Sequence, residues 1–206
     1  MLSRFAVCSA TAVTSLALVA GAQAQVELTT NGGFEAGDTS SWDDFTAGNQ
    51  SFGVINNVAE GAFAGEIVNP DEGTGAVVKQ ANIGIGQVNP GDMLTVSFFA
   101  AGDFGPGGVA FAEFFSELDG GGTSSAEILG GTPLPLTSDY QFFTFDVVAG
   151  SDVSGGVTVQ FNAATGAVAG STANLRIDGL SVVVPEPASL GLLGLTGVAL
   201  LRRRTA

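Results

Sequence analysis

The sequence predicts an all-β protein whose strands form a two-sheet sandwich or jelly roll of eight or nine strands. Short runs rich in Val, Ile and Phe alternate with clusters of Gly, Asn, Asp and Pro, as in strands joined by turns. Between the two ends of the chain, no stretch sustains the 3.6-residue period of an amphipathic helix. Glycine occurs 31 times, about twice its usual frequency, which is typical of tight turns and loops.

The expected strands follow one another along residues 54–184, each bounded by turn-forming residues. Residues 111–118 are ambiguous because their acidic residues are four apart, yet the aromatic residues and flanking glycines favour a strand. We expect exposed loops at 103–108 and 118–131. The strands are expected at 54–58, 62–68, 76–83, 93–101, 109–115, 140–148, 157–161 and 175–184.

Phenylalanine is expected to dominate the core of this domain. The chain has 15 phenylalanines, of which only Phe5 lies before residue 25, and each can bury a large apolar area. The one cysteine, Cys8, lies outside the expected domain, so no disulfide framework is available. Stability must therefore come from packing, assisted by any metal ion that oxygen ligands hold.

The charge balance excludes several classes of function. The chain has 20 acidic and 6 basic residues, and residues 25–184 contain 19 acids against Lys79 and Arg176, a net charge of 2 − 19 = −17. Nucleic-acid binding requires clustered Lys and Arg, so nucleic acid is excluded as a partner. The absence of histidine excludes Ser-His-Asp and Cys-His catalysis and histidine metal sites.

The first 24 residues are predicted to be a secretory signal peptide. Arg4 supplies the positive charge, residues 5–20 are almost wholly apolar or small, and Ala22 and Ala24 form the A-x-A pattern for cleavage before Gln25. The apolar run is shorter than the ~20 residues that a membrane span needs. We therefore expect the general secretory machinery to export the chain, with residues 25–184 as the folded domain.

Residues 185–206 carry a second targeting signal. Pro185, Glu186 and Pro187 precede the Gly-rich apolar run 188–201, which is expected to form a short transmembrane helix. The arginines that follow should remain cytoplasmic, which leaves the acidic domain outside the cytoplasm. These arginines are Arg202, Arg203 and Arg204.

The order of tripeptide, apolar run and basic end resembles the PEP-CTERM sorting tail of Gram-negative bacteria. The resemblance implies retention at the inner membrane and processing near Pro187 by exosortase, a membrane-embedded transpeptidase-like protease. It also implies delivery to the cell surface or to the exopolysaccharide matrix of a biofilm. The alternative is a plain C-terminal membrane anchor.

Residues 26–184 resemble a carbohydrate-binding-module-like jelly roll of the galactose-binding-like class. The resemblance rests on small motifs that occur in the family's order, none of them diagnostic alone. They are Asn31-Gly32-Gly33-Phe34-Glu35, Ser41-Trp42, Val88-Asn89-Pro90-Gly91-Asp92 before residues 94–100, Tyr140-Gln141-Phe142-Phe143-Thr144-Phe145, and Leu175-Arg176-Ile177-Asp178-Gly179-Leu180.

Two of these motifs suggest a cation site. The turn at Asn31 should place Glu35 where the C-terminal strand returns with Asp178, and two adjacent carboxylates repel unless a proton or a cation joins them. The resemblance implies a structural Ca²⁺ with Glu35 and Asp178 as ligands. The alternatives are that both are solvated turn residues, or that Arg176 pairs with one of them.

Candidates for ligand binding and catalysis are few. Sugar recognition uses aromatic faces, above all those of Trp and Tyr, and the domain offers only Trp42 and Tyr140, with packing the favoured interpretation for both. Glu113 and Glu117 are the candidate carboxylate pair of a glycosidase, but a solvated or groove-lining acidic face is favoured.

We therefore expect a non-enzymatic, exported β-sandwich protein that exosortase processes and that acts at the cell surface or in the matrix. A glycan-binding module is the first alternative, with exopolysaccharide as the partner. A glycoside hydrolase or lyase is the second.

Overall fold

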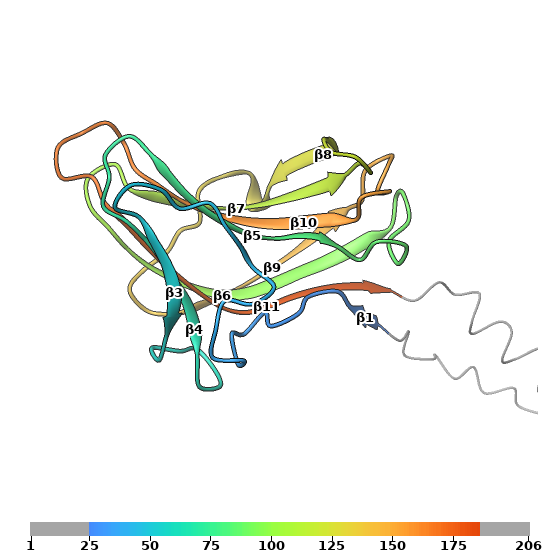
Figure 1. The fold of residues 1–206 in the computed structure, drawn as a ribbon, viewed down its shortest axis with the longest axis horizontal. Coiled ribbons are helices and arrows are strands. Elements are labelled where there is room, and N and C mark those ends of the chain that lie inside the picture. Colours follow the sequence, from blue (N-terminus) through green and yellow to red (C-terminus); the bar gives the residue numbers. More distant parts are fainter. Residues whose placement is uncertain (1–24, 186–206) are drawn as a thin grey trace, which may run out of the picture. The chain divides into compact units, whose positions relative to one another are not determined.

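The computed structural model describes residues 25–185, which form two antiparallel β-sheets stacked face to face (Figure 1). Sheet A has the order β3 (Ser51–Ile55), β4 (Ala64–Asn69), β11 (Ala173–Pro185), β6 (Met93–Phe104) and β9 (Gln141–Val148), and β1 (Gln25–Glu27) pairs with the end of β11. Sheet B has the order β2 (Asp43–Asp44), β5 (Gly75–Ile83), β10 (Val157–Ala164), β7 (Val109–Glu117) and β8 (Thr123–Ile128), followed by the 3-10 turn η1 (Leu129–Gly131).

The predicted all-β sandwich is confirmed, and each of the eight expected hydrophobic runs overlaps a strand, although β3 (Ser51–Ile55) shares only Val54 and Ile55 with the expected run 54–58. Three further strands, β1, β2 and β8, bring the number to eleven. The prediction of a loop over 118–131 is wrong, because β8 lies within it. Its sequence Thr-Ser-Ser-Ala-Glu-Ile has little hydrophobic signal, and its pairing with β7 is what makes it a strand. Similarly, β6 extends to Phe104, into the expected loop 103–108.

Phenylalanines fill the space between the sheets, as the composition predicts. Phe34, Phe98, Phe114 and Phe161 are fully buried, and the rings of Phe98 and Phe161 meet edge to face across the sandwich with centroids 4.9 Å apart. Aromatic pairs prefer such edge-to-face geometry, which adds to the free energy from burial alone.

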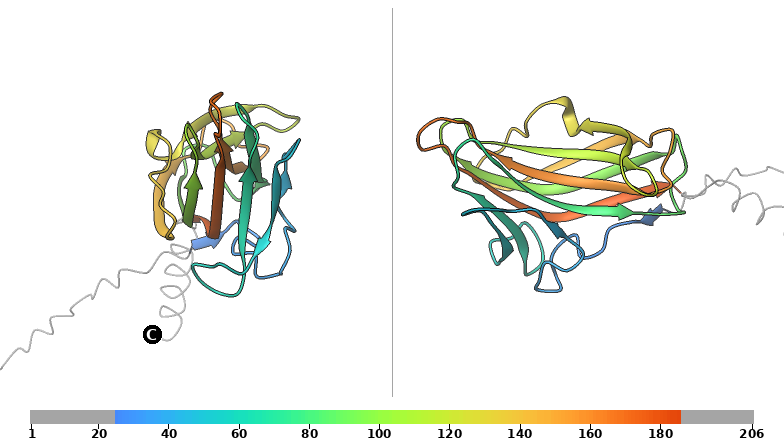
Figure 2. Two further views of the ribbon diagram at one scale, coloured as in Figure 1. Left: turned by 90° about the vertical axis from the view of Figure 1, so that its left-hand side faces the viewer. Right: turned by 45° about the horizontal axis from the view of Figure 1, so that its top comes forward.

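Two groups of connecting loops lie at opposite ends of the domain (Figure 1). The terminal pole, defined by loops 84–92, 118–122 and 149–156, is where β1 begins and β11 ends. The far pole is defined by loops 70–74, 105–108 and 165–172. Figure 2 shows the neighbouring strands β3, β4 and β11 side by side in cyan, teal and red.

Within residues 25–185, no helix is long and apolar enough to span a membrane. The predicted signal peptide and the apolar run at 188–201 lie outside the described residues.

Candidate functional site

A row of side chains crosses the outward face of all five strands of sheet B. Residues directly opposite in an antiparallel ladder project to the same face. Asp43 lies opposite Lys79, Lys79 opposite Gln160, and Gln160 opposite Glu113. Ile128 of β8 lies opposite Glu113 and completes the row. We call these five residues the polar row.

One hydrogen bond joins two members of the polar row, and a third member, Lys79, contacts a nearby aromatic ring. The Nε2 atom of Gln160 donates to Oε2 of Glu113 at 2.6 Å. The Nζ atom of Lys79 lies 4.9 Å from the ring centroid of Phe45, which is 55% exposed. The row thus offers an amine and an amide as donors and carboxylates as acceptors, beside an exposed aromatic ring.

Phenylalanines flank the polar row on β7. Phe111 and Phe115 alternate with Glu113, so all three project from the outward face, and each is partly exposed. Phe111 lies opposite Asn162 and Phe115 lies opposite Thr158. The Oδ1 atom of Asn162 is buried without a hydrogen-bond partner. Rings beside mixed donors and acceptors match a polyhydroxylated ligand, whose C–H faces pack on rings and whose hydroxyls both donate and accept.

The carboxylates on β7 are poorly spaced for glycosidase chemistry. Glu113 and Glu117 are four residues apart on one strand, which separates them by roughly 13 Å. Paired glycosidase carboxylates lie about 5 to 10 Å apart. In addition, Glu113 is engaged by Gln160. This geometry favours the groove-lining interpretation of these acids.

The structure brings the side chains of Glu35 and Asp178 to the same loop, residues 59–63. Asp178 is only 1% exposed and lies on β11 beside a bulge at Gly179, whose φ is 57°. Its Oδ2 accepts hydrogen bonds from the backbone N–H groups of Ala59 (2.9 Å) and Glu60 (3.0 Å).

Glu35 contacts the same 59–63 loop. Its Oε1 accepts hydrogen bonds from the N–H groups of Ala62 (2.9 Å) and Phe63 (3.1 Å). Gly33 lies beside both side chains. A Cβ placed on Gly33 would lie 3.6 Å from Oδ1 of Asp178 and 3.8 Å from Cγ of Glu35.

Asp178 carries one carboxylate oxygen without a hydrogen-bond partner, the buried Oδ1. Burial raises the pKa of Asp178, the backbone donors lower it, and the charge of Glu35 raises it further. Within residues 25–185 no group of three or more His, Cys, Asp or Glu side chains could hold a metal ion, so Ca²⁺ here would need backbone carbonyls as well.

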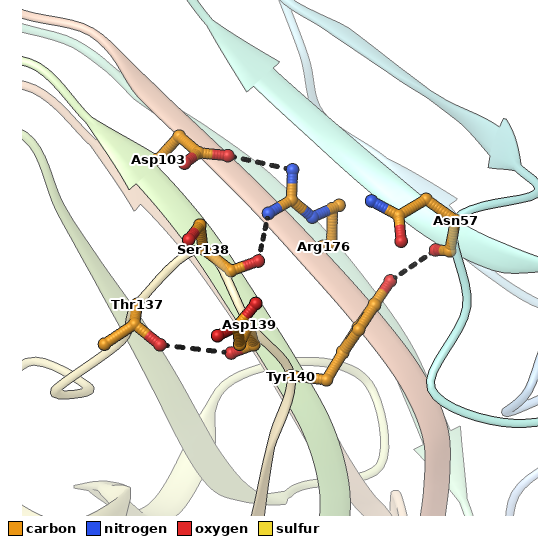
Figure 3. Close-up of polar contacts among 7 residues, drawn as sticks. All are labelled: Asn57, Asp103, Thr137, Ser138, Asp139, Tyr140 and Arg176. Carbon is orange, nitrogen blue, oxygen red and sulfur yellow. Dashed lines mark hydrogen bonds and ion pairs between the residues drawn. The ribbon is translucent and has the colours of Figure 1, made fainter.

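Arg176 does not pair with Glu35 or Asp178. Its Nη1 donates to Oδ2 of Asp103 at 2.9 Å, and its Nη2 donates to the carbonyl of Ser138 at 2.9 Å (Figure 3). The guanidinium is largely buried and fastens the 137–139 segment to sheet A.

The two aromatic candidates have packing contacts. Trp42 is 7% exposed, stacks on Phe34 at 4.9 Å, and donates from Nε1 to the carbonyl of Asn31. It therefore presents little ring surface to a ligand. Tyr140 donates its hydroxyl to the carbonyl of Asn57 at 2.7 Å (Figure 3), and burial, followed by the charge of Asp178, raises its pKa to about 12.

The sorting residues lie at the edge of the described part. Pro185 is the last residue of β11 and lies opposite Gln25, the residue that follows the predicted signal cleavage. The other predicted targeting residues lie outside the described residues: Ala22, Ala24, Glu186, Pro187, Arg202, Arg203 and Arg204.

Comparisons with known proteins identify the tail and the fold separately. Residues 183–204 match the family model of the PEP-CTERM protein-sorting motif, which implies export, membrane anchoring and exosortase processing. No curated protein matches the chain.

Solved structures resemble the sandwich at low sequence identity. The enzymatically active domain of bacteriophage CBA120 tailspike protein 4 gives a TM-score of 0.61 at 14% identity, covering 77% of this chain but 21% of the tailspike chain. The CBM22-1 xylan-binding domain of Paenibacillus barcinonensis Xyn10C gives 0.56 at 13% identity, covering 82% of this chain and 100% of that domain. The CBM22-2 xylan-binding domain of the same protein gives 0.51 at 17% identity, covering 74% and 97%. At these identities the likeness establishes a jelly-roll fold similar to carbohydrate-binding modules, and residues 183–204 carry a PEP-CTERM sorting motif.

Proposed function

We propose that this protein is an exosortase-processed surface or matrix protein whose β-sandwich binds a polysaccharide without cleaving it. The sorting motif supports delivery of the domain to the outside of the cell. The sandwich is then the part that meets the exopolysaccharide of the matrix.

The observation that carries glycan binding is the polar row between phenylalanines on sheet B. Glu113 and Gln160 lie at the centre of the row, held to each other at 2.6 Å, while Phe111 and Phe115 stand on either side of Glu113. A hydrogen-bonded pair is already oriented before a ligand arrives, which reduces the entropy lost on binding.

The resemblance to xylan-binding domains supports a polysaccharide as the ligand class. The spacing of Glu113 and Glu117 supports binding over hydrolysis, because a pair roughly 13 Å apart cannot act on one glycosidic bond as acid and nucleophile.

A binding measurement on the processed protein purified from its host tests this function. Affinity electrophoresis or calorimetry would use the host's own exopolysaccharide, with xylan as a second probe. We expect Phe111→Ala and Gln160→Ala each to weaken binding by roughly tenfold or more, equivalent to about 1.4 kcal/mol.

The matched control is Val168→Ala, which removes an exposed apolar side chain from a loop at the far pole. It should bind as the wild type does. If the wild type binds neither polysaccharide, or if both variants on sheet B bind normally, the proposed function is wrong. Release of reducing sugar ends during the incubation would instead support the hydrolase alternative.

A further inference from the structure

The sorting motif overlaps the folded domain. The matched segment begins at Val183, whereas β11 continues to Pro185. Three residues of the segment, including the first proline of Pro-Glu-Pro, are therefore strand residues of sheet A.

All three residues pair with β1, and Val184 also packs into the core, where it is 3% exposed. Val183 still lies opposite Thr95 of β6, but that ladder ends there. Within residues 25–185, Val184 and Pro185 have ladder partners only in β1, namely Val26 and Gln25. We call residues 25–29 the N-terminal clamp. Its pairing continues at Leu28, whose N–H donates to the carbonyl of Val182 at 2.9 Å.

Glu27 is the side chain that fastens the clamp. Its Oε1 accepts hydrogen bonds from the N–H of Val182 at 3.1 Å and from the N–H of Thr29 at 2.8 Å. The hydroxyl of Thr29 donates to the same oxygen at 2.6 Å, and the hydroxyl of Ser181 donates to Oε2. One carboxylate thus joins the first strand of the domain to the strand that leads into Pro-Glu-Pro.

Hydrogen bonds to an ionised acceptor are stronger than those between neutral groups. Partial burial alone would raise the pKa of Glu27, but hydrogen bonds from Ser181, Thr29 and Val182 lower it overall. Glu27 is therefore ionised at neutral pH, and its charge strengthens the contacts that hold β11.

We propose that the N-terminal clamp controls processing of the tail, with Glu27 as a positioning residue that sets how readily exosortase reaches its substrate. This proposal rests on the processing that the sorting motif implies. Processing breaks one peptide bond near Pro187 and passes the acyl group to water or to an acceptor amine. The clamp affects access to that bond and takes no part in those steps.

Local opening connects the clamp to the processing rate. A protease binds a stretch of chain on both sides of the bond it cleaves, and residues 183–185 are unavailable while they remain paired. When opening and closing are fast relative to cleavage, the cleavage rate follows the population of the open form. Such opening at strand ends requires less free energy than global unfolding.

The test follows the full-length chain in its native host by pulse-chase and intact mass, measuring conversion of the anchored precursor to the processed form. Glu27→Gln keeps the side-chain shape but removes the charge, and we expect conversion to be roughly fivefold faster. The matched control is Asp146→Asn. Asp146 is another outward carboxylate of sheet A that accepts a hydrogen bond, from Thr95 at 2.8 Å, but it lies on β9.

A covalent lock tests the same idea in the opposite direction. Glu27 and Val183 lie directly opposite each other, so the double variant Glu27→Cys/Val183→Cys can form a disulfide outside the cytoplasm. We expect the locked precursor to accumulate and the reductant dithiothreitol to restore its conversion. Each single cysteine variant should be processed without any effect of reductant.

The outcomes distinguish failure of the N-terminal clamp proposal from failure of the exosortase processing on which it rests. If the wild type is never processed, both exosortase processing and the clamp are overturned. If the wild type is processed and the locked variant is processed at the same rate, only the clamp is overturned. A Glu27→Gln precursor that accumulates would also contradict the clamp, because it would make Glu27 a residue that assists cleavage.

Discussion

At the scale of single residues, Asp178 shows how burial affects a carboxylate. It is 1% exposed, two backbone N–H groups satisfy one carboxylate oxygen, and the other oxygen has no partner. A buried, partly satisfied carboxylate destabilises a fold unless it is protonated or paired with a cation. The stability of this domain should therefore respond to both protons and Ca²⁺.

We predict that Ca²⁺ stabilises the wild type through Glu35 and Asp178. At about a hundred times Kd, the rise in Tm should be about 5 to 10 °C. Glu35→Gln and Asp178→Asn should each abolish most of this rise in a calorimetric scan. Asp119→Asn, which removes an exposed carboxylate at the terminal pole, should keep it.

The raised pKa of Asp178 determines how the stability of the fold depends on pH. Because burial raises the pKa of Asp178 in the folded state, its charge destabilises the fold above that pKa, and this loss is recovered as pH falls through it. Without Ca²⁺, Asp178→Asn should therefore be at least as stable as the wild type at pH 7 and lose that advantage in acid. A wild type indifferent to Ca²⁺ would rule out the cation site.

At the scale of elements, the Phe34 turn and β4 fit each other closely. Phe34 has a φ of 58° and is fully buried, so the turn points its ring into the core against β4. A Cβ on Gly65 of β4 would lie 2.3 Å from Cζ of Phe34. Glycine at this position is what allows the turn that carries Glu35 to pack on sheet A.

We predict that Gly65→Ala destabilises the domain by about 2 kcal/mol or more, because the core must shift to admit a methyl group. Gly53→Ala on the neighbouring β3 is the matched control, since a Cβ there would meet nothing within 4 Å. Urea denaturation of both variants measures the difference. Equal stability of the two would mean that the turn is more adaptable than this packing indicates.

The strands that local sequence predicts are those that bury a hydrophobic side. β5, β6 and β10 alternate buried and partly exposed residues, and each lies in an expected run. β1 and β8 could not be predicted in this way, because their side chains carry little hydrophobic signal. β1 is a strand through its pairing with the distant β11, and β8 through its pairing with β7, which precedes it in the chain.

The candidate site, too, could be predicted only in part from the sequence. The two-residue spacing of Phe111, Glu113 and Phe115 is enough to predict that these three residues share one face of a strand. Lys79 and Gln160 joined them only through the register of β5, β10 and β7, which depends on contacts between distant residues. For the cation site, the turn residues predicted the pair, but the unpartnered Oδ1 of Asp178 is visible only in the structure.

At the scale of the whole molecule, the excess of acidic residues affects both stability and the class of ligand. Residues 25–184 carry 19 acids, with Lys79 and Arg176 as the basic residues, and Arg176 is already paired with Asp103. Self-repulsion of this size opposes compaction and also repels polyanions. A neutral polysaccharide, or one bridged by cations, is the ligand class consistent with such a surface.

We predict that the Tm rises when NaCl increases from about 0.01 M to about 1 M, because the Debye length falls from about 30 Å to about 3 Å. Measurements should be made with a chelator so that divalent ions do not contribute. The double variant Asp119→Asn/Glu127→Gln, which removes two exposed acids, should show a smaller rise. A Tm that falls with salt would mean that attractive pairs outweigh the repulsion.

The position of β11 determines how the domain bears mechanical load. β11 lies inside sheet A, with β4 and β1 along one side and β6 along the other, and it is the strand from which the tail leaves. A pull on the chain beyond Pro185 acts along the axis of this strand, and the hydrogen bonds to its neighbours run across that axis. They are therefore strained together in shear and do not open one after another. If the domain is tethered at this end and flow pulls on it, the pulling force acts on β11. Because β11 has neighbours on both sides, the domain would resist mechanical unfolding.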